Sequence, residues 1–279
     1  MKLYDLFQFE KTNKMKTIWL SGSNGFLGKN LLESLNKNYQ CNPILRVTYP
    51  QELKGDILIH CGWISAANSN DLNNSNQIDN ITESISLFHR GLRGGIKHFI
   101  FIGSSWQDSK YGNNLYQFSK NKTHDILRKL CEINNVKYNL IIPYWIYGLY
   151  DKPNRFIPSI INKCLNNQDI AMHPAQNMVD YLFCDDFISA IDLILRKGEN
   201  FQDYNICSGY GYKTQDIVEK IKELTCSKSK TSHNKEYPKN FNMEWIGNND
   251  KLKEIGWLQK INLEDGLKRT INYERLNRI

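Results

Sequence analysis

Short apolar runs alternate with amphipathic stretches along most of the chain. Helical periodicity fills most of the intervals between the runs, and strands that alternate with helices predict a doubly wound parallel sheet in an α/β protein. The interval between Asn38 and Asp56 is too short for two strands and a crossover, so one element is expected to be trimmed there. Strands are expected near residues 17–21, 44–48, 56–61, 98–103, 138–143 and 181–184.

A glycine-rich turn joins the first predicted strand to the first predicted helix. Gly22-x-x-Gly25-x-x-Gly28 follows the apolar run 18–20 and precedes the helical run 31–35. In such a turn, backbone N–H groups at a helix N-terminus face a space without Cβ atoms, which suits a pyrophosphate. An ordinary strand-to-helix turn can have the same spacing, so the prediction of a dinucleotide site depends on further signals downstream.

The second signal is a tyrosine and a lysine placed four residues apart in a stretch of helical periodicity. Tyr116 and Lys120 share one helix face, so both side chains can point into one cavity. The ammonium favours the phenolate and moves the tyrosine pKa, ordinarily about 10, towards useful acid–base strength. Upstream, Ser104 and Ser105 follow an apolar run, at the strand end where open parallel sheets bind ligands. Tyrosine–lysine pairs also occur on solvated helix faces, but the order of these three signals makes coincidence the poorer explanation.

With these motifs in this order, the chain resembles the extended short-chain dehydrogenases/reductases that act on nucleotide sugars. The resemblance runs from Thr17 to about Tyr273, and Trp145 stands where the family usually has an asparagine. It implies a Rossmann-type doubly wound parallel sheet with a smaller C-terminal substrate-binding lobe. Further stretches that match the family are 56–62, Asn80, 143–148, 155–158, 180–186, 249–257 and 263–267.

The resemblance also divides the chain into parts. Residues 1–14 have no counterpart in the family pattern and form an N-terminal extension, unless Met15 is an alternative start. Residues 15–145 form the dinucleotide-binding core, and 180–207 pack back on it. Residues 146–179 and 208–279 form the substrate-binding lobe.

The same resemblance implies roles for individual residues. The catalytic residues are Ser104, Tyr116 and Lys120, with Ser105 as the alternative hydroxyl. The cofactor positions are Gly22, Asn24, Gly25, Phe26, Leu27, Gly28, Arg46, Cys61, Gly62, Trp63, Asn80, Ile102, Tyr116, Lys120, Pro143, Tyr144 and Ile146. The substrate positions are Ser104, Ser105, Trp106, Trp145 and Arg155. No metal site is expected, because the six histidines show no ligand spacing.

The residues directly after the fourth predicted strand limit which of the family's reactions can be expected. Dehydratases of the family carry an acid pair beside the catalytic hydroxyl, and Ser104-Ser105-Trp106 has none. The stretches 103–107 and 114–116 are similar to those of the CDP-abequose and CDP-paratose synthases, which reduce a 4-keto-6-deoxy sugar nucleotide. The expected function is therefore NADPH-dependent reduction of the 4-keto group of a nucleotide-activated 4-keto-6-deoxy sugar. The alternatives are a nucleotide-sugar 4-epimerase with tightly bound NAD and a non-catalytic dinucleotide-sensing protein.

The choice of cofactor depends on the end of the second predicted strand. An NAD site usually carries an acid there, whereas an NADP site uses a cation for the 2′-phosphate. The run 44–47 offers Arg46 and no acid, so NADPH is expected, with NADH or NAD as the alternative. In the expected mechanism, Ser104 orients the carbonyl and Tyr116 gives the proton. Lys120 binds the nicotinamide ribose and lowers the pKa of Tyr116.

Composition adds limits on class and partners. The net charge of +7 is spread without a basic stripe, so no nucleic-acid partner is expected. The seven cysteines include no C-x-x-C pair, which favours reduced thiols in a cytoplasmic protein. No run approaches the ~20 apolar residues of a membrane span. By the resemblance, a homodimer is expected to pair through the helices near 76–94 and 115–134.

Overall fold

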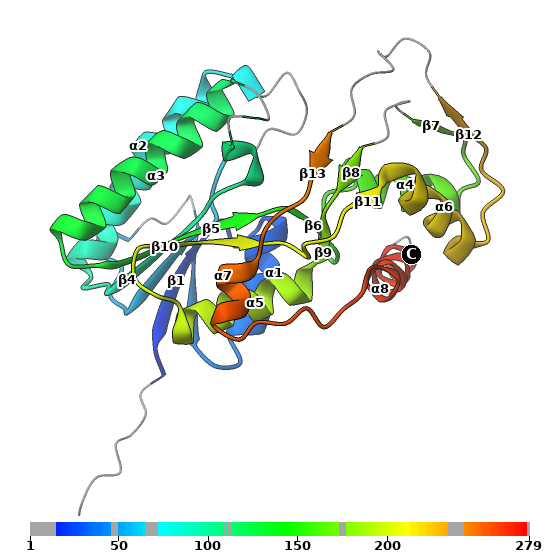
Figure 1. Ribbon diagram of the computed structural model, residues 1–279. Helices are drawn as coiled ribbons and strands as arrows, with labels where there is room; N and C mark the ends of the chain where they lie inside the picture. Colours follow the sequence, from blue (N-terminus) through cyan, green and yellow to red (C-terminus); the bar gives the residue numbers. More distant parts are fainter. Residues whose placement is uncertain are drawn as a thin grey trace, which may run out of the picture.

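A six-stranded parallel sheet forms the centre of the larger lobe (Figure 1). The computed structural model describes residues 15–45, 50–64, 72–108, 110, 113–172, 177–233 and 243–277. The strand order is β10-β5-β4-β3-β1-β2, and every neighbouring pair is parallel. The strands are β1 (Thr17–Ser21), β2 (Gln40–Ile44), β3 (Ile57–His60), β4 (His98–Ile102), β5 (Lys137–Pro143) and β10 (Gln202–Ile206). The α/β class and the Rossmann-type sheet are thereby confirmed.

Helices cover both faces of this sheet. On one face, α1 (Phe26–Leu35) and α5 (Cys184–Lys197) bury leucines and isoleucines against the strands. On the other face, α2 (Asn76–Arg93) and α3 (Leu115–Ile133) enclose a second core rich in phenylalanine, and the two helices pack along each other. The interior strands are mostly apolar because both of their sides are buried, and polar residues within them such as His60, His98 and Asn139 are buried as well.

The two edge strands differ from the sequence prediction. The sixth strand of the sheet is β10, and not the run at 181–184, since β9 (Tyr181–Phe183) pairs outside the sheet with β6 (Trp145–Tyr147). The second strand lies at 40–44, and residues 46–48 of the strand expected at 44–48 lie outside the described residues. Both edge strands are only partly buried, so neither forms an apolar run that could be recognised. Within 38–45 and 50–56, the described part of the short interval, β2 is the only helix or strand.

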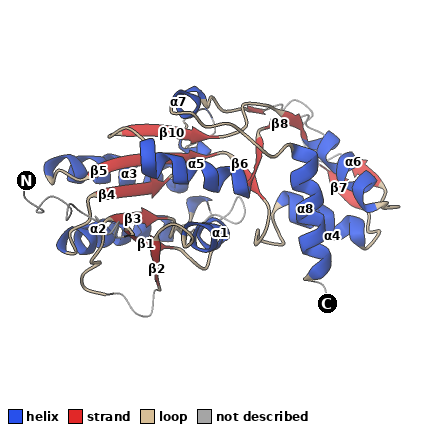
Figure 2. Cartoon of the chain, turned by 90° about the horizontal axis from the view of Figure 1, so that it is seen from below, coloured by secondary structure: helices blue, strands red, loops and turns tan. Residues whose placement is uncertain are grey.

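The smaller lobe lies beside the C-terminal ends of the strands (Figure 2). Its core joins apolar side chains from its helices with those of the β6–β9 pair. Its elements are α4 (Phe156–Leu165), β7 (Ile170–Met172), β8 (Met178–Val179), β11 (Tyr212–Lys213), α6 (Thr214–Thr225), β12 (Thr231–His233), β13 (Glu244–Trp245) and α8 (Leu263–Leu276). The short helix α7 (Asp250–Glu254), expected within this lobe, lies instead against β10, with Leu252 in the core of the sheet.

A buried carboxylate gathers several segments that cross between the two lobes. Asp180 is fully buried and accepts hydrogen bonds from the Ser208 amide (2.7 Å) and hydroxyl (2.6 Å). It also accepts the amides of Gly209 (2.9 Å) and Gly247 (3.2 Å), while its own carbonyl accepts the Trp145 amide (3.2 Å). These hydrogen bonds to one residue fix the positions of the crossing segments relative to one another.

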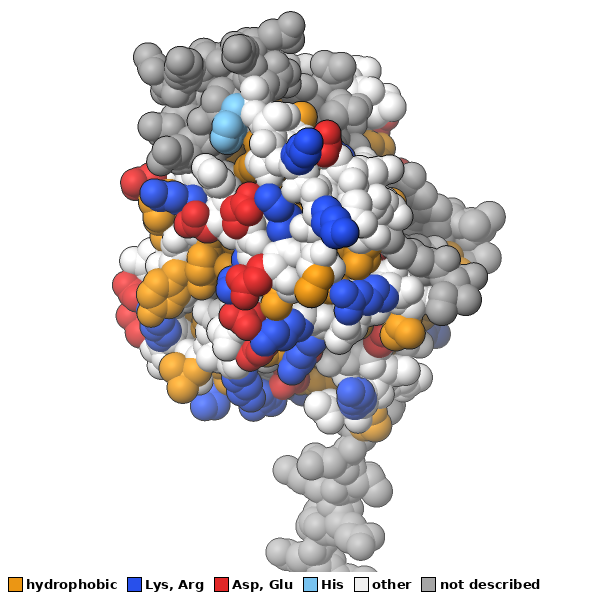
Figure 3. Space-filling view, turned by 90° about the vertical axis from the view of Figure 1, so that its right-hand side faces the viewer, with side chains coloured by type: hydrophobic (Ala, Val, Ile, Leu, Met, Phe, Trp, Pro, Cys, Tyr) orange, Lys and Arg blue, Asp and Glu red, His pale blue; other side chains and the backbone are white. Residues whose placement is uncertain are grey.

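Among the described residues, acidic and basic side chains are mixed on the face of the smaller lobe shown in Figure 3. Several of them pair on α6 and α8, such as Lys220 with Glu223 and Lys268 with Glu264. None of the helices in the described part of the chain is long and apolar enough to cross a membrane. All seven cysteines are free, and Cys226 alone among them is exposed.

Candidate active site

One cavity of about 500 Å³ opens where the carboxyl ends of the sheet strands meet the smaller lobe. It is lined by most of the residues expected at the cofactor and substrate positions. Those that line it are Gly22, Gly25, Phe26, Leu27, Gly28, Cys61, Trp63, Ile102, Ser104, Ser105, Trp106, Tyr116, Lys120, Pro143, Tyr144, Trp145, Ile146 and Arg155. Asn24, Gly62 and Asn80 do not line it, and Arg46 lies outside the described residues.

The glycine turn is shaped by contacts of backbone with backbone. Gly22 has a φ of +72°, and a Cβ there would lie 2.6 Å from the Gly62 amide nitrogen. A Cβ on Gly28 would lie 2.1 Å from the Gly22 carbonyl oxygen. Gly25 is the N-cap of α1 and has no side chain to satisfy the amides of the first turn. These amides at the wall of the cavity fit the pyrophosphate of a dinucleotide.

The loop after β3 is held by a chain of buried side chains. The His60 ring lies between the hydroxyls of Ser21 (2.6 Å) and Ser84 (2.8 Å). Burial lowers the pKa of His60 to about 3, so the ring is neutral. The Ser21 hydroxyl accepts the Gly62 amide (3.1 Å), and the side-chain carbonyl oxygen of Asn80 accepts the Ile64 amide (2.9 Å). Gly62 and Asn80 thus support the cavity wall from behind.

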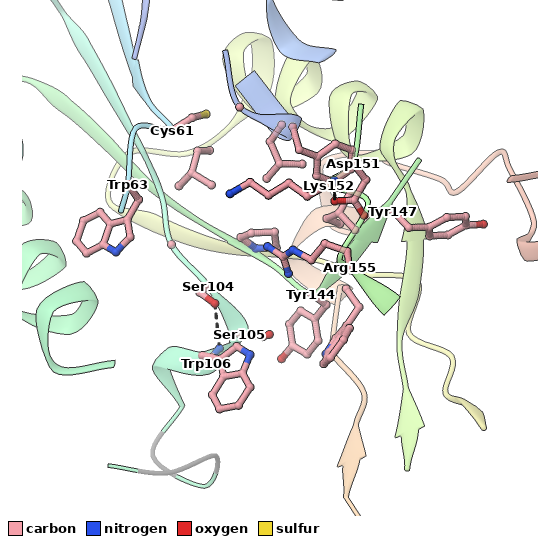
Figure 4. A pocket seen from close by; sticks show the side chains of 18 of the residues that line it. Cys61, Trp63, Ser104, Ser105, Trp106, Tyr144, Tyr147, Asp151, Lys152 and Arg155 are labelled. Atoms are coloured by element: carbon pink, nitrogen blue, oxygen red, sulfur yellow. Dashed lines mark hydrogen bonds between the residues drawn. The ribbon is translucent and has the colours of Figure 1, made fainter. Parts of the chain in front are cut away.

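Ser104 and Tyr116 are brought together at the end of β4. Ser104 follows the strand and Tyr116 lies in the first turn of α3, where Asn114 caps the helix by accepting the Gln117 amide (2.9 Å). Burial raises the pKa of Tyr116, whereas a hydrogen bond with the Ser104 side chain and the charge of Arg155 act in the opposite direction. The Ser104 hydroxyl also accepts the Trp106 amide at 3.2 Å, drawn as the dashed line in Figure 4.

Lys120 differs from the sequence prediction in what it contacts. Its Nζ donates to the Ile102 carbonyl oxygen (2.7 Å) and lies 3.9 Å from the centre of the Trp63 ring. Only 3% of the residue is exposed, and burial lowers the pKa of Lys120 to about 7. The charge that lowers the pKa of Tyr116 in this structure is that of Arg155, and the expected effect of Lys120 on the phenol stays a prediction.

Two cations and a carboxylate reach the cavity from the segment before α4. Figure 4 shows Lys152 and Arg155 extending into it, and Asp151 lies at the same wall. Burial raises the pKa of Asp151 to about 6, although Arg155 partly offsets this effect. Sequence reasoning missed Asp151 and Lys152. The signal that could have found them is the pair of charged residues that comes shortly after Gly148, the end of the stretch 143–148 that matches the family.

Aromatic rings from separate parts of the chain line the end of the cavity beyond Ser104. The Trp106 ring packs on Trp245, with centroids 4.6 Å apart, and Trp145 meets both Trp245 (5.7 Å) and Tyr181 (6.0 Å). Phe156 stacks on Tyr181 at 6.2 Å. Further lining residues that were not assigned to a cofactor or substrate position are Leu72, Gly103, Tyr147 and Ile157.

Comparison with known proteins agrees with this geometry. A sequence model of the NAD dependent epimerase/dehydratase family matches residues 41–207, which is more than half of the chain, and the chain belongs to this family. Within it, the chain is 32% identical over 130 residues to CDP-abequose synthase from Salmonella muenchen, covering 46% of this chain and 44% of that protein. It is 25% identical over 299 residues to GDP-L-colitose synthase from Yersinia pseudotuberculosis, covering 92% and 97%.

The fold also matches solved structures. UDP-glucose 4-epimerase from Thermotoga maritima, solved with UDP-glucose, aligns with a TM-score of 0.80 at 19% identity, over 94% of this chain and 100% of that one. The chain spans less than half the length of CDP-abequose synthase in their alignment. The family match and the shared fold therefore agree with each other.

Proposed function

We propose that the protein reduces the 4-keto group of a nucleotide-activated 4-keto-6-deoxy sugar with NADPH. The observation that carries this proposal is the Ser104–Tyr116 pair at the end of β4, in the same cavity as the glycine turn. Similarity to CDP-abequose synthase and the absence of an acid beside Ser104 favour a reductase over a dehydratase.

The protonation state of Tyr116 suits reduction. Burial raises the pKa of this phenol, so it carries its proton at neutral pH and is ready to act as a general acid. The nicotinamide cofactor, when bound, supplies hydride to the carbonyl carbon. Ser104 orients the carbonyl oxygen by hydrogen bonding, and Tyr116 gives its proton to that oxygen as negative charge develops. An epimerase would instead begin with a phenolate that removes a proton from a hydroxyl group.

The opposite wall supplies groups that suit the rest of the substrate. Arg155 and Lys152 place two positive charges in the cavity, where a nucleotide diphosphate carries negative charge. Trp106 and Trp145 offer ring faces to the apolar side of a sugar and to its methyl group. The cofactor is proposed to be NADPH because the run 44–47 contains Arg46 and no acid.

The second candidate is a nucleotide-sugar 4-epimerase with tightly bound NAD. The family includes epimerases by name, and the UDP-glucose 4-epimerase of Thermotoga maritima shares the fold. The epimerase and the reductase use the same serine, tyrosine and lysine, so they differ in whether the cofactor is consumed.

The test is to incubate the purified protein with NADPH and a panel of CDP-, GDP-, dTDP- and UDP-linked 4-keto-6-deoxy sugars. A reductase oxidises one NADPH for each keto-sugar that disappears, and Tyr116→Phe abolishes this signal. Protein that purifies with NAD and equilibrates two 4-hydroxy nucleotide sugars without net cofactor consumption would establish the epimerase instead.

A further inference from the structure

We infer that Gln107, together with Asn121, is a positioning residue that aims the Ser104 hydroxyl at Tyr116. This inference rests on the proposed function only in taking Ser104 and Tyr116 as the catalytic pair. Neither Gln107 nor Asn121 lines the cavity, so both act through Ser104 and not on the substrate.

Gln107 holds Ser104 by its backbone. The segment after β4 makes a short 3-10 turn (Ser105–Gln107) with Ser104 as its N-cap. The Gln107 Oε1 accepts the Ser104 amide at 2.9 Å, and the Gln107 amide donates to the Ser104 carbonyl oxygen at 3.0 Å. Because the Trp106 amide donates to the Ser104 hydroxyl, this is a reciprocal capping box, in which both ends of the turn satisfy each other.

The nitrogen of the Gln107 side-chain amide is hydrogen-bonded to α3. Its Nε2 donates to the Asn121 Oδ1 at 3.1 Å, and the Asn121 Nδ2 donates back to the Gln107 carbonyl oxygen at 3.0 Å. Asn121 directly follows Lys120 and lies little more than one turn after Tyr116 on the same helix. One side-chain amide therefore connects the backbone of the serine to the helix that carries the phenol.

Gly103 explains why this side chain can fold back. A Cβ at Gly103 would lie 2.2 Å from the Gln107 Oε1, so a larger residue would displace the amide from Ser104. The spacing Gly103-Ser104-x-x-Gln107 is thus a structural unit. One lone pair of the Ser104 hydroxyl is occupied by the Trp106 amide, which leaves its hydrogen and its other lone pair for the Tyr116 phenol at the wall of the same cavity.

The test uses the full chain without substrate or cofactor. Tyrosine labelled with ¹³C at Cζ is incorporated, and the Tyr116 resonance is identified as the one that Tyr116→Phe removes. Its position reports the hydrogen bond to the phenol at neutral pH. Gln107→Met keeps the length of the side chain and removes both amide functions. Gln117→Met is the matched control, because Gln117 is also buried and donates to the carbonyl oxygens of Asp108 (2.8 Å) and Gln107 (3.4 Å) without touching Ser104 or the Gln107 side chain.

We expect Ser104→Ala to displace the Tyr116 resonance, and Gln107→Met to displace it in the same direction by at least half as much. Combining the two should add nothing to Ser104→Ala alone, and Gln117→Met should leave the resonance in place. Additive displacements, or a resonance that Ser104→Ala or Gln107→Met does not move, would overturn the inference. If Gln107→Met does not fold, Asn121→Ala takes its place and must move the resonance in the same direction. Since no substrate is used, a failure of the proposed function leaves this result unaffected.

Discussion

The two halves of the cavity are built by different means. At the glycine turn, backbone meets backbone: Gly22 and Gly28 approach so closely that no Cβ fits between them. At the far end, the wall consists of aromatic side chains such as Trp106, Trp145 and Tyr181, which come from separate segments and touch through their rings. Where backbone packs on backbone, only glycine fits at the contact positions. Where rings pack on rings, another ring of similar size can replace the original one.

The largest expected effect is a loss of kcat on changing Tyr116, which lies between the two halves of the cavity. Tyr116→Phe removes one oxygen and keeps the ring, so folding and NADPH affinity should be unchanged while kcat falls about 10²–10⁴-fold. The measurement is steady-state NADPH oxidation with the keto-sugar that the panel identifies, alongside NADPH titration by fluorescence. Near-normal kcat in this variant would assign the proton to another group.

The backbone half should be the less tolerant of small changes. Gly28→Ala places a methyl group 2.1 Å from the Gly22 carbonyl oxygen. The strain should cost about 1–3 kcal/mol, which corresponds to a rise in the NADPH Kd of roughly 10- to 100-fold or an equal loss of stability. Gly25→Ala is the control for stability alone, since its Cβ would lie 3.3 Å from the same oxygen and Gly25 itself lines the cofactor site. Equal losses of stability in the two variants would show that packing does not explain the turn.

Lys120 lies between the halves, and its burial should appear in the pH dependence of stability. Its folded pKa of about 7 is below the 10.5 of an exposed lysine, so between these values the unfolded chain binds more protons. The free energy of unfolding should therefore rise with pH through this interval. The rise amounts to at most about 1.4 kcal/mol for each pH unit by which the two values differ.

Lys120→Met should remove this rise and stabilise the protein at pH 7, while weakening NADPH binding. Urea unfolding at several pH values measures the first effect. Lys129→Met on the same helix is the control, because the Lys129 side chain is 67% exposed. An unchanged pH slope in Lys120→Met would show that the ammonium is not held in the buried position.

The smallest effect is expected in the ring-lined half. Trp145→Phe keeps an aromatic partner for Trp245 and Tyr181, so stability should fall by only about 1 kcal/mol. The KM for the nucleotide sugar should rise a few-fold, and the KM for NADPH should stay the same. A loss of NADPH affinity in this variant would mean that the two halves are not separate.

The sequence predicts the parts of the fold and site that depend on local spacing. The glycine turn and the Tyr116–Lys120 pair each lie within a few residues, and the structure brings both to one cavity. The interior strands are predicted because burial on both faces makes them apolar. The edge strand β10 was missed, since Gln202, Asp203 and Asn205 keep it polar where one side is open to solvent.

The features that the sequence could not predict depend on contacts between distant segments. The approach of Arg155 to Tyr116 requires the segment before α4 and the first turn of α3 to line one cavity, which no local pattern encodes. The burial of Asp151 has the same origin. The ring wall could not be assembled for the same reason, because Trp106 and Trp245 lie far apart in the chain and meet only after folding.

Asp180 has a consequence for exchanging parts between members of the family. Asp186 lies six residues later and is likewise buried, accepting the amides of Lys260 (3.0 Å) and Ile261 (2.9 Å). Both carboxylates belong to the segment that returns to the core, whereas Gly247 and Ile261 arrive from the other lobe. A chimaera that joins this core to a foreign lobe keeps the two acceptors and replaces their donors. Whether such a chimaera folds should therefore depend more on the few backbone amides that bond to these two carboxylates than on the fit between the surfaces of the two lobes.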